Sequence, residues 1–177
     1  MRITGGTLKN RPVRVPDCKG VRPTPARVRE ALFHRLLPHL HGARVLDAFG
    51  GSGVLALEAW SRGASTVVCV ERDKKAARQI IQTVQSLGAD GIQVRVRDSR
   101  RLKDERFDIV LADPPYADPP GPWLRVLAPL VAPDGVLVFE HRAGTLPRGP
   151  HDGLRVTWQR RYGDTELTFL APVPPTP

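Results

Sequence analysis

The stretch that decides the fold is Phe107-Asp108-Ile109-Val110-Leu111-Ala112-Asp113-Pro114-Pro115-Tyr116. Its first six residues are mostly apolar, which predicts a strand buried on both faces of a parallel sheet. Ligands of open α/β sheets bind just beyond the carboxyl ends of such strands. The Asp-Pro-Pro-Tyr turn is therefore expected at a binding site.

The residues of this turn suit a planar base that carries an exocyclic amine. Asp113 offers a carboxylate that accepts from N–H groups, and two prolines remove backbone donors, so that the Pro114 carbonyl meets little competition. The ring of Tyr116 offers a surface on which a base stacks. We predict that Asp113, Pro114 and Tyr116 are catalytic. A rigid turn that only ends a strand is the alternative, because Pro-Pro is common in turns.

Outward from this turn, apolar runs alternate with amphipathic segments, which predicts an α/β fold. Strands are expected at residues 43–49, 67–70, 92–96, 107–112 and 135–140, and helices at 25–39, 54–60, 74–87 and 123–131. Thr24 is expected to cap the first helix, with Pro25 at its first position. Residues 154–162 and 166–170 follow without an intervening helix, which predicts a terminal antiparallel pair. The expected fold is Rossmann-like, with a mostly parallel sheet of seven strands and helices on both faces.

The ends of the chain differ in composition from its middle. Residues 1–23 are interpreted as a basic β-hairpin arm, too polar to belong to the core. Residues 24–171 form the predicted α/β domain. Residues 172–177 are a proline-rich tail that is not expected to fold.

A glycine turn, Gly50-Gly51-Ser52-Gly53, follows the first strand and lets the backbone approach a ligand. Asp47 precedes it, Glu71 ends the second strand, and Asp98 follows the third. An acid at the position of Glu71 typically receives ribose hydroxyls. Asp47 would repel a pyrophosphate but attract an ammonium group, which favours S-adenosylmethionine as the cofactor. The predicted cofactor site comprises Asp47, Phe49, Gly51, Gly53, Glu71, Arg72, Asp98 and Ser99.

The net charge of +9 is concentrated at one end of the chain. Residues 1–44 hold ten Lys and Arg residues but only two acids. Such an asymmetry favours a polyanion such as RNA as partner over a merely solvated basic face. The predicted RNA-binding residues are Arg2, Lys9, Arg11, Arg14, Arg22, Arg27 and Arg29.

Composition argues against several other classes of protein. No apolar run approaches the length of a membrane span, and the N-terminus lacks the apolar stretch of a signal peptide. Two cysteines, Cys18 and Cys69, are too few for a disulfide framework. The histidines show no metal-ligand spacing, so no metal is expected. We expect a cytoplasmic monomer.

Several motifs together resemble the RsmD group of class I methyltransferases, which act on the guanine N2 amine of 16S ribosomal RNA. The motifs are VLDAFGGSG (45–53), LEAWSRGA (57–64), VERD (70–73), DPPY (113–116), RITGG (2–6), RPT (22–24), RVREALF (27–33) and YGDT (162–165). The resemblance covers the chain except its proline-rich tail. It implies guanine 966 as the target, and the small ribosomal subunit or an assembly intermediate as the partner. Thr83 lies near the position where the family usually has an asparagine.

Three other functions remain open on the sequence. A DNA adenine-N6 methyltransferase would use the same turn, but the chain has no room for a sizeable target-recognition segment. A non-catalytic RNA-binding assembly factor would be expected to lack Asp47, Glu71 or Asp113. A nicotinamide or flavin oxidoreductase is suggested by residues 51–56, which match the dinucleotide pattern G-x-G-x-x-A.

Overall fold

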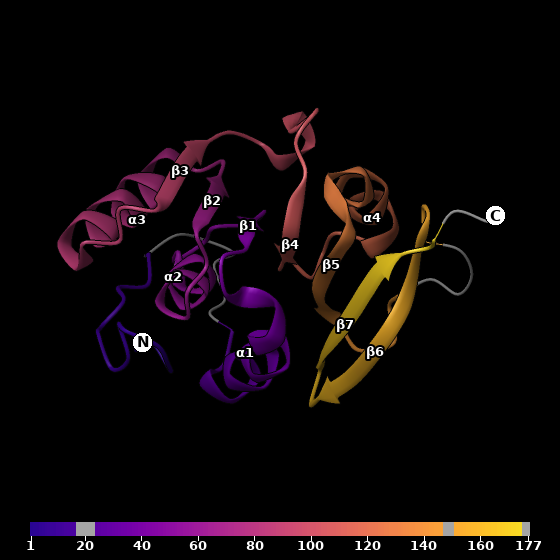
Figure 1. Ribbon diagram of the computed structural model, residues 1–177, viewed down its shortest axis with the longest axis horizontal. Helices are drawn as coiled ribbons and strands as arrows, with labels where there is room; N and C mark the ends of the chain where they lie inside the picture. Colours follow the sequence, from indigo (N-terminus) through magenta and orange to yellow (C-terminus); the bar gives the residue numbers. More distant parts are fainter. Residues whose placement is uncertain (17–23, 147–150, 175–177) are drawn as a thin grey trace.

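The computed structural model describes residues 1–16, 24–146 and 151–174, and its centre is a seven-stranded sheet (Figure 1). The strands are β1 (Arg44–Asp47), β2 (Thr66–Glu71), β3 (Ile92–Val96), β4 (Phe107–Ala112), β5 (Val131–Arg142), β6 (Leu154–Tyr162) and β7 (Thr165–Pro172). Their spatial order is β3-β2-β1-β4-β5-β7-β6. The order reverses between β1 and β4, the place where open α/β sheets bind ligands.

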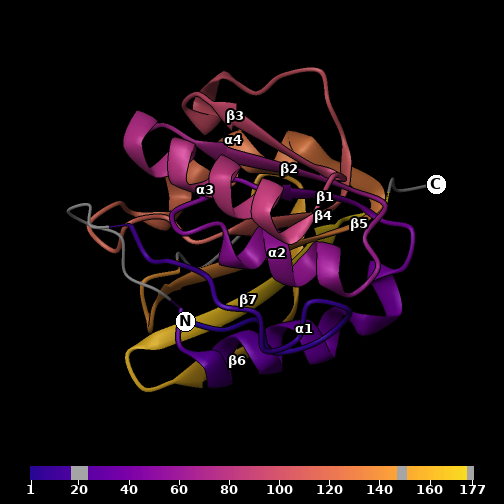
Figure 2. The same ribbon diagram turned by 90° about the vertical axis from the view of Figure 1, so that its left-hand side faces the viewer.

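Helices cover both faces of the sheet (Figure 2). They are α1 (Ala26–Leu40), α2 (Val54–Ser61), α3 (Lys74–Leu87) and α4 (Pro120–Leu127), with short 3-10 helices at Ser99–Arg101 (η1) and Ala128–Leu130 (η2). Successive strand residues point to opposite faces. In β1, Val45 therefore packs in the cluster beneath α1, α2 and α3, whereas Leu46 packs in the cluster beneath α4.

The predicted fold class is confirmed, including the change of strand direction near the end of the chain. β1 to β5 are parallel, and β7 is antiparallel to both β5 and β6, between which it lies. The predicted helix 74–87 is also confirmed: the Asp73 side chain accepts from the Ala76 N–H, and Gly88 ends the helix with a φ of +63°. No helix in the described ranges is long and apolar enough to cross a membrane.

The prediction for the start of the first helix is wrong. Helix α1 begins at Ala26, and Pro25 is its N-cap residue, without a capping side chain. The Thr24 hydroxyl lies 3.2 Å from a carboxylate oxygen of Asp113 and 3.2 Å from one of Glu140. The Thr24 hydroxyl, which was predicted to cap the helix, therefore contacts residues far away in the sequence instead.

The N-terminal segment, residues 1–16, is packed on the domain instead of projecting from it (Figures 1 and 2). A single antiparallel bridge joins Arg2 to Pro12, so this part of the described chain lacks the two strands of the predicted hairpin. Ile3 and Val13 are 1% and 2% exposed and belong to the main core, which contradicts the expectation that the segment is too polar for it. These two side chains help to anchor an otherwise polar segment, because each buried one contributes about 1.5–3 kcal/mol.

Candidate active site

A cavity of about 830 Å³ opens at the carboxyl edge of the sheet. The predicted site residues that line it are Phe49, Gly51, Glu71, Arg72, Asp98, Ser99, Asp113, Pro114 and Tyr116. They come from the carboxyl end of β2 and from the loops after β1, β2, β3 and β4, so the topology brings distant parts of the sequence together. Asp47 and Gly53 are not among the lining residues. The volume is within the range of small-molecule sites, about 300–1,000 Å³.

The glycine turn and Glu71 form one wall of this cavity. The Glu71 carboxylate accepts from the Gly51 N–H at 2.8 Å and from the Asp73 N–H at 2.7 Å, one bond to each oxygen. A carboxylate has about four acceptor positions, so further donors can be bound. Gly50 must be small, because a Cβ there would lie 2.8 Å from the Cys69 sulfur. The turn is thus fixed by Glu71 and lies close against β2.

Asp47 lies behind the cavity wall, with 1% of its surface exposed. Its carboxylate accepts from the N–H groups of Phe49 and Ala56, at 3.3 and 3.2 Å. Burial raises the pKa of Asp47 from 3.8 to about 7, against the lowering effect of these two hydrogen bonds. The side chain therefore positions the turn directly, from behind the cavity wall.

The buried Asp47 is expected to make stability fall as the pH rises from about 4 to about 7. Because its folded pKa is above its unfolded one, the native state binds more protons in that window, and the free energy of unfolding decreases with pH. Asp47→Asn should remove this contribution, on the order of 2 kcal/mol between pH 5 and pH 8. Urea unfolding of both proteins at the two pH values measures it, and equal pH dependence would contradict the assignment.

Another part of the cavity wall is built from Asp98, Ser99 and an aromatic pair. The Asp98 carboxylate accepts from the Arg100 N–H at 2.9 Å and begins η1, while the Ser99 hydroxyl donates to the Ala48 carbonyl. Phe49 and Trp123 are in edge-to-face contact, with ring centroids 4.7 Å apart. Trp123 also lines the cavity, and it was not predicted as a site residue.

The Asp-Pro-Pro-Tyr turn is held from two directions. Asp113 accepts from the Thr24 hydroxyl, in the segment before α1, and the Tyr116 hydroxyl lies 2.6 Å from the Thr165 hydroxyl, at the start of β7. Thr24, Thr165 and Glu140 all line the cavity, and none was predicted as a site residue. A signal was present for two of them, because Thr24 and Thr165 belong to the RPT and YGDT motifs.

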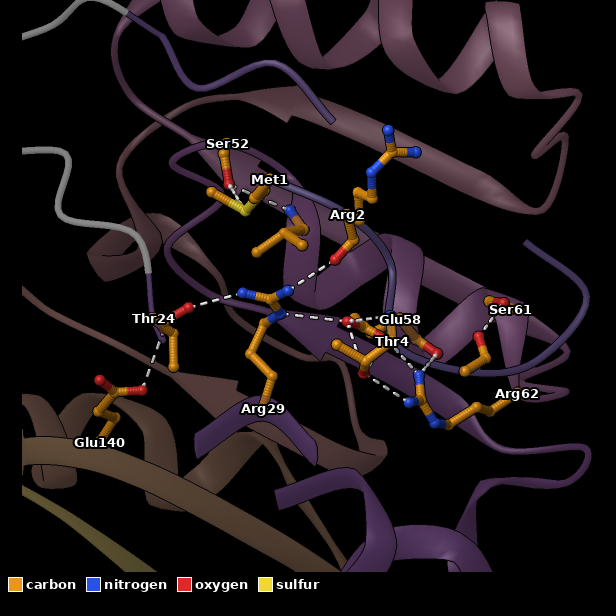
Figure 3. Close-up of polar contacts among 12 residues, drawn as sticks. Met1, Arg2, Thr4, Thr24, Arg29, Ser52, Glu58, Ser61, Arg62 and Glu140 are labelled. Carbon is orange, nitrogen blue, oxygen red and sulfur yellow. Dashed lines mark hydrogen bonds and ion pairs between the residues drawn. The ribbon is translucent and has the colours of Figure 1, made fainter. Parts of the chain in front are cut away.

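The prediction that Arg29 binds RNA is contradicted by its buried position (Figure 3). It is 2% exposed and pairs with Glu58, with its Nε 3.1 Å from the carboxylate. Its other nitrogens donate to the carbonyls of Thr24 and Arg2, both at 2.7 Å. A guanidinium whose donors are satisfied inside the protein is not available to phosphate. The reason for the error is that Arg29 projects toward α2 and the N-terminal segment, which a count of charges does not reveal.

Glu58 of α2 is the centre of this buried network (Figure 3). Its carboxylate accepts from Arg29, from Arg62, and from both the N–H and the hydroxyl of Thr4. The side chain of Glu58 has no exposed surface. The network therefore ties the N-terminal segment, α1 and α2 together.

The remaining predicted RNA-binding residues lie at the surface or outside the described ranges. The exposed ones are Arg2, Lys9, Arg11, Arg14 and Arg27. Arg22 lies outside the described residues. Within the described residues, no group of three or more His, Cys, Asp or Glu side chains could hold a metal ion.

Comparisons with known proteins place this geometry among methyltransferases. The model of the family described as Conserved hypothetical protein 95 matches residues 1–171. Ribosomal RNA small subunit methyltransferase D of Escherichia coli K12 is 40% identical over 119 residues, 66% of this chain and 60% of the relative. The Haemophilus influenzae protein of the same name is 37% identical over 123 residues, 66% of this chain and 64% of the relative. The match thus spans less than two thirds of these curated relatives. The solved structure of yhhF from Escherichia coli has a TM-score of 0.87 and 28% identity, and covers 97% of both chains.

Proposed function

The chain belongs to the Conserved hypothetical protein 95 family, the RsmD family of class I methyltransferases, and on this premise we propose that it methylates a guanine of 16S ribosomal RNA. The acceptor is the exocyclic N2 amine, the target is guanine 966, and the partner is the small ribosomal subunit or an assembly intermediate in the cytoplasm. One observation carries the proposal: Asp113 and Tyr116 line the same cavity as Glu71 and the glycine turn.

The described residues fit S-adenosylmethionine as the methyl donor. Glu71 has acceptor positions left for two ribose hydroxyls, and Asp98 beside the Phe49–Trp123 pair offers a polar and an apolar contact for the adenine. The buried Asp47 carboxylate favours a cationic ammonium group on the other side of the glycine turn. When bound, S-adenosylmethionine supplies a methyl group on a sulfonium, whose thioether product is neutral, so no metal is required.

The Asp-Pro-Pro-Tyr turn would activate the amine. A guanine amine is a weak nucleophile because its lone pair is delocalised into the ring. The Asp113 carboxylate and the Pro114 carbonyl would accept hydrogen bonds from its two N–H groups and favour a pyramidal nitrogen with a free lone pair. When that nitrogen takes the methyl group from the sulfonium, one of its protons would leave to Asp113 or to water. Tyr116, held by Thr165, would fix the base by stacking, which contributes ~1–3 kcal/mol. Much of the acceleration would come from this positioning.

The RNA must present its base outside a helix, because a stacked base cannot enter the cavity. The exposed basic residues of the N-terminal segment, together with Arg27, would contact phosphates, and the affinity should then fall with salt. The N-terminal segment would do so as a packed part of the domain, because Arg29 and Glu58 hold it in place.

Replacing Glu71 with glutamine is expected to weaken S-adenosylmethionine binding by about 10–100-fold. The reason is the loss of two charge-assisted hydrogen bonds to the ribose, each worth about 1.5–3 kcal/mol, of which a neutral amide retains part. Titration calorimetry measures the affinity. The matched control is Glu105→Gln, because Glu105 pairs with Arg44 and Arg95 away from the cavity. Unchanged affinity in Glu71→Gln would contradict this part of the proposal.

The function as a whole is tested by transfer of a tritiated methyl group from S-adenosylmethionine to three substrates in parallel. These are unmodified small ribosomal subunits, naked 16S RNA and plasmid DNA. We expect label in the subunit or the RNA. Label only in DNA would move the conclusion to an adenine-N6 methyltransferase, and no label despite cofactor binding would favour a binding role.

A further inference from the structure

The edge strand β6 carries a strip of aromatic and basic side chains on one face. Trp158, Arg160 and Tyr162 share that face, because the side chains of a strand alternate. Trp158 lies opposite Phe169 of β7, and Arg160 lies opposite Leu167. Phe169 and Leu167 belong to the core cluster that packs beneath α1. The strip therefore faces the side of the sheet that α1 covers.

Aromatic rings hold two guanidinium groups in this strip. Arg35 of α1 lies over the Trp158 ring at 4.8 Å, and Arg160 lies over the Tyr162 ring at 5.5 Å. Both rings are half-buried, whereas both arginines are exposed. Neither arginine makes an ion pair within the part of the chain that the structure describes. We call Arg35, Trp158, Arg160 and Tyr162 the β6 strip.

The β6 strip begins next to the cavity. Tyr162 is paired with Thr165 across the hairpin, and Thr165 lines the cavity and contacts the hydroxyl of Tyr116. From there the strip follows β6 to Trp158, a length of roughly 13 Å for four residues of strand. A chain that leaves the cavity beside Tyr116 would thus meet these side chains in order.

We propose that the β6 strip binds the single-stranded RNA on one side of the target guanine, an inference that rests on the proposed function. Guanidinium groups without acidic partners attract phosphates and bind them with two donors. The rings limit the motion of these groups, so less freedom is lost when RNA binds. A base that enters the cavity must come from an unstacked segment, and the backbone next to it needs a path across the protein surface.

The test compares two neighbouring arginines of β6. Arg160→Ala removes a charge from the strip, and Arg161→Ala removes the same charge from the opposite face, where Arg161 lies opposite Glu166 in the strand register. We measure the affinity for a fluorescent single-stranded RNA that contains the target guanine. Arg160→Ala should weaken binding about tenfold, and Arg161→Ala less than twofold. In the Arg35→Ala/Arg160→Ala double variant, the slope of log affinity against log salt should become shallower by about 1.4, or about 0.7 per phosphate contact.

Equal affinities of Arg160→Ala and Arg161→Ala would overturn the proposal. RNAs shortened on either side of the guanine give a second criterion: the effect of Arg160→Ala should disappear when one flank is removed. If Arg160→Ala still weakens binding of an RNA that lacks both flanks, the strip does not bind the flanking RNA.

Methyl transfer, measured in parallel, separates this inference from the proposed function. If wild-type protein methylates RNA but Arg160→Ala binds it as well as wild type does, the proposal of RNA binding by the β6 strip fails and the proposed function stands. If no RNA is methylated, the proposed function fails, and the affinity comparison still decides the role of the strip.

Discussion

Asp113→Ala is expected to lower kcat for methyl transfer by roughly 10²–10³-fold, the loss typical of removing one pre-organised electrostatic contact. The carboxylate is held by the Thr24 hydroxyl at 3.2 Å and lines the cavity together with Tyr116. Alanine cannot accept a hydrogen bond from the amine, so the nitrogen lone pair stays delocalised. Single-turnover transfer to RNA, with both substrates saturating, measures the chemical step.

Cofactor affinity provides the control for this variant. The predicted ribose contact involves Glu71 at the end of β2, whereas Asp113 follows β4, so Asp113→Ala should bind S-adenosylmethionine within about threefold of wild type. Thr24→Val is a milder test of the same contact, because it removes only the hydroxyl that orients Asp113. Wild-type turnover in Asp113→Ala would rule out the proposed role of the carboxylate.

Glu58→Ala is expected to lower the free energy of unfolding by about 3–5 kcal/mol, because it leaves the buried Arg29 without its counter-charge. Arg62 and Thr4 lose the same acceptor. The cavity should be affected as well, since Arg29 also donates to the carbonyl of Thr24, the residue that contacts Asp113. Urea unfolding measures the stability.

A second glutamate that pairs with two arginines gives the matched control. Glu105 contacts Arg44 and Arg95, but its side chain is 24% exposed. Exposed pairs contribute at most about 1 kcal/mol, so Glu105→Ala should cost far less than Glu58→Ala. Similar losses of unfolding free energy in the two variants would show that burial does not determine how much the Glu58 network contributes to stability.

Much of the fold follows from local patterns in the sequence. The helix 74–87 could be predicted with its bounds because apolar spacing, Asp73 and Gly88 agree. The pairing of β7 with β5 could not, since strand order depends on contacts far apart in sequence. The buried Ile3 and Val13 were missed for the same reason: the apolar partners of the N-terminal segment lie in distant elements.

The candidate site was predictable where chemistry and topology coincide. Residues at the carboxyl ends of parallel strands must converge, which brought Glu71, Asp98 and Asp113 to one cavity. The burial of Arg29 was not predictable from a count of charges. The same count drew attention to residues 1–44 and away from Arg160, which the fold places on an edge strand near the cavity.

The most direct test of the central proposal is nucleoside analysis of 16S RNA after reaction with S-adenosylmethionine and the protein. The substrate is an unmodified small subunit or its naked RNA, and Asp113→Ala is run beside the wild type. We expect N2-methylguanosine from the wild type, at guanine 966, and roughly 10²–10³-fold slower formation of it by the variant. A different methylated nucleoside, or equal yields from both proteins, would contradict the role assigned to the Asp-Pro-Pro-Tyr turn.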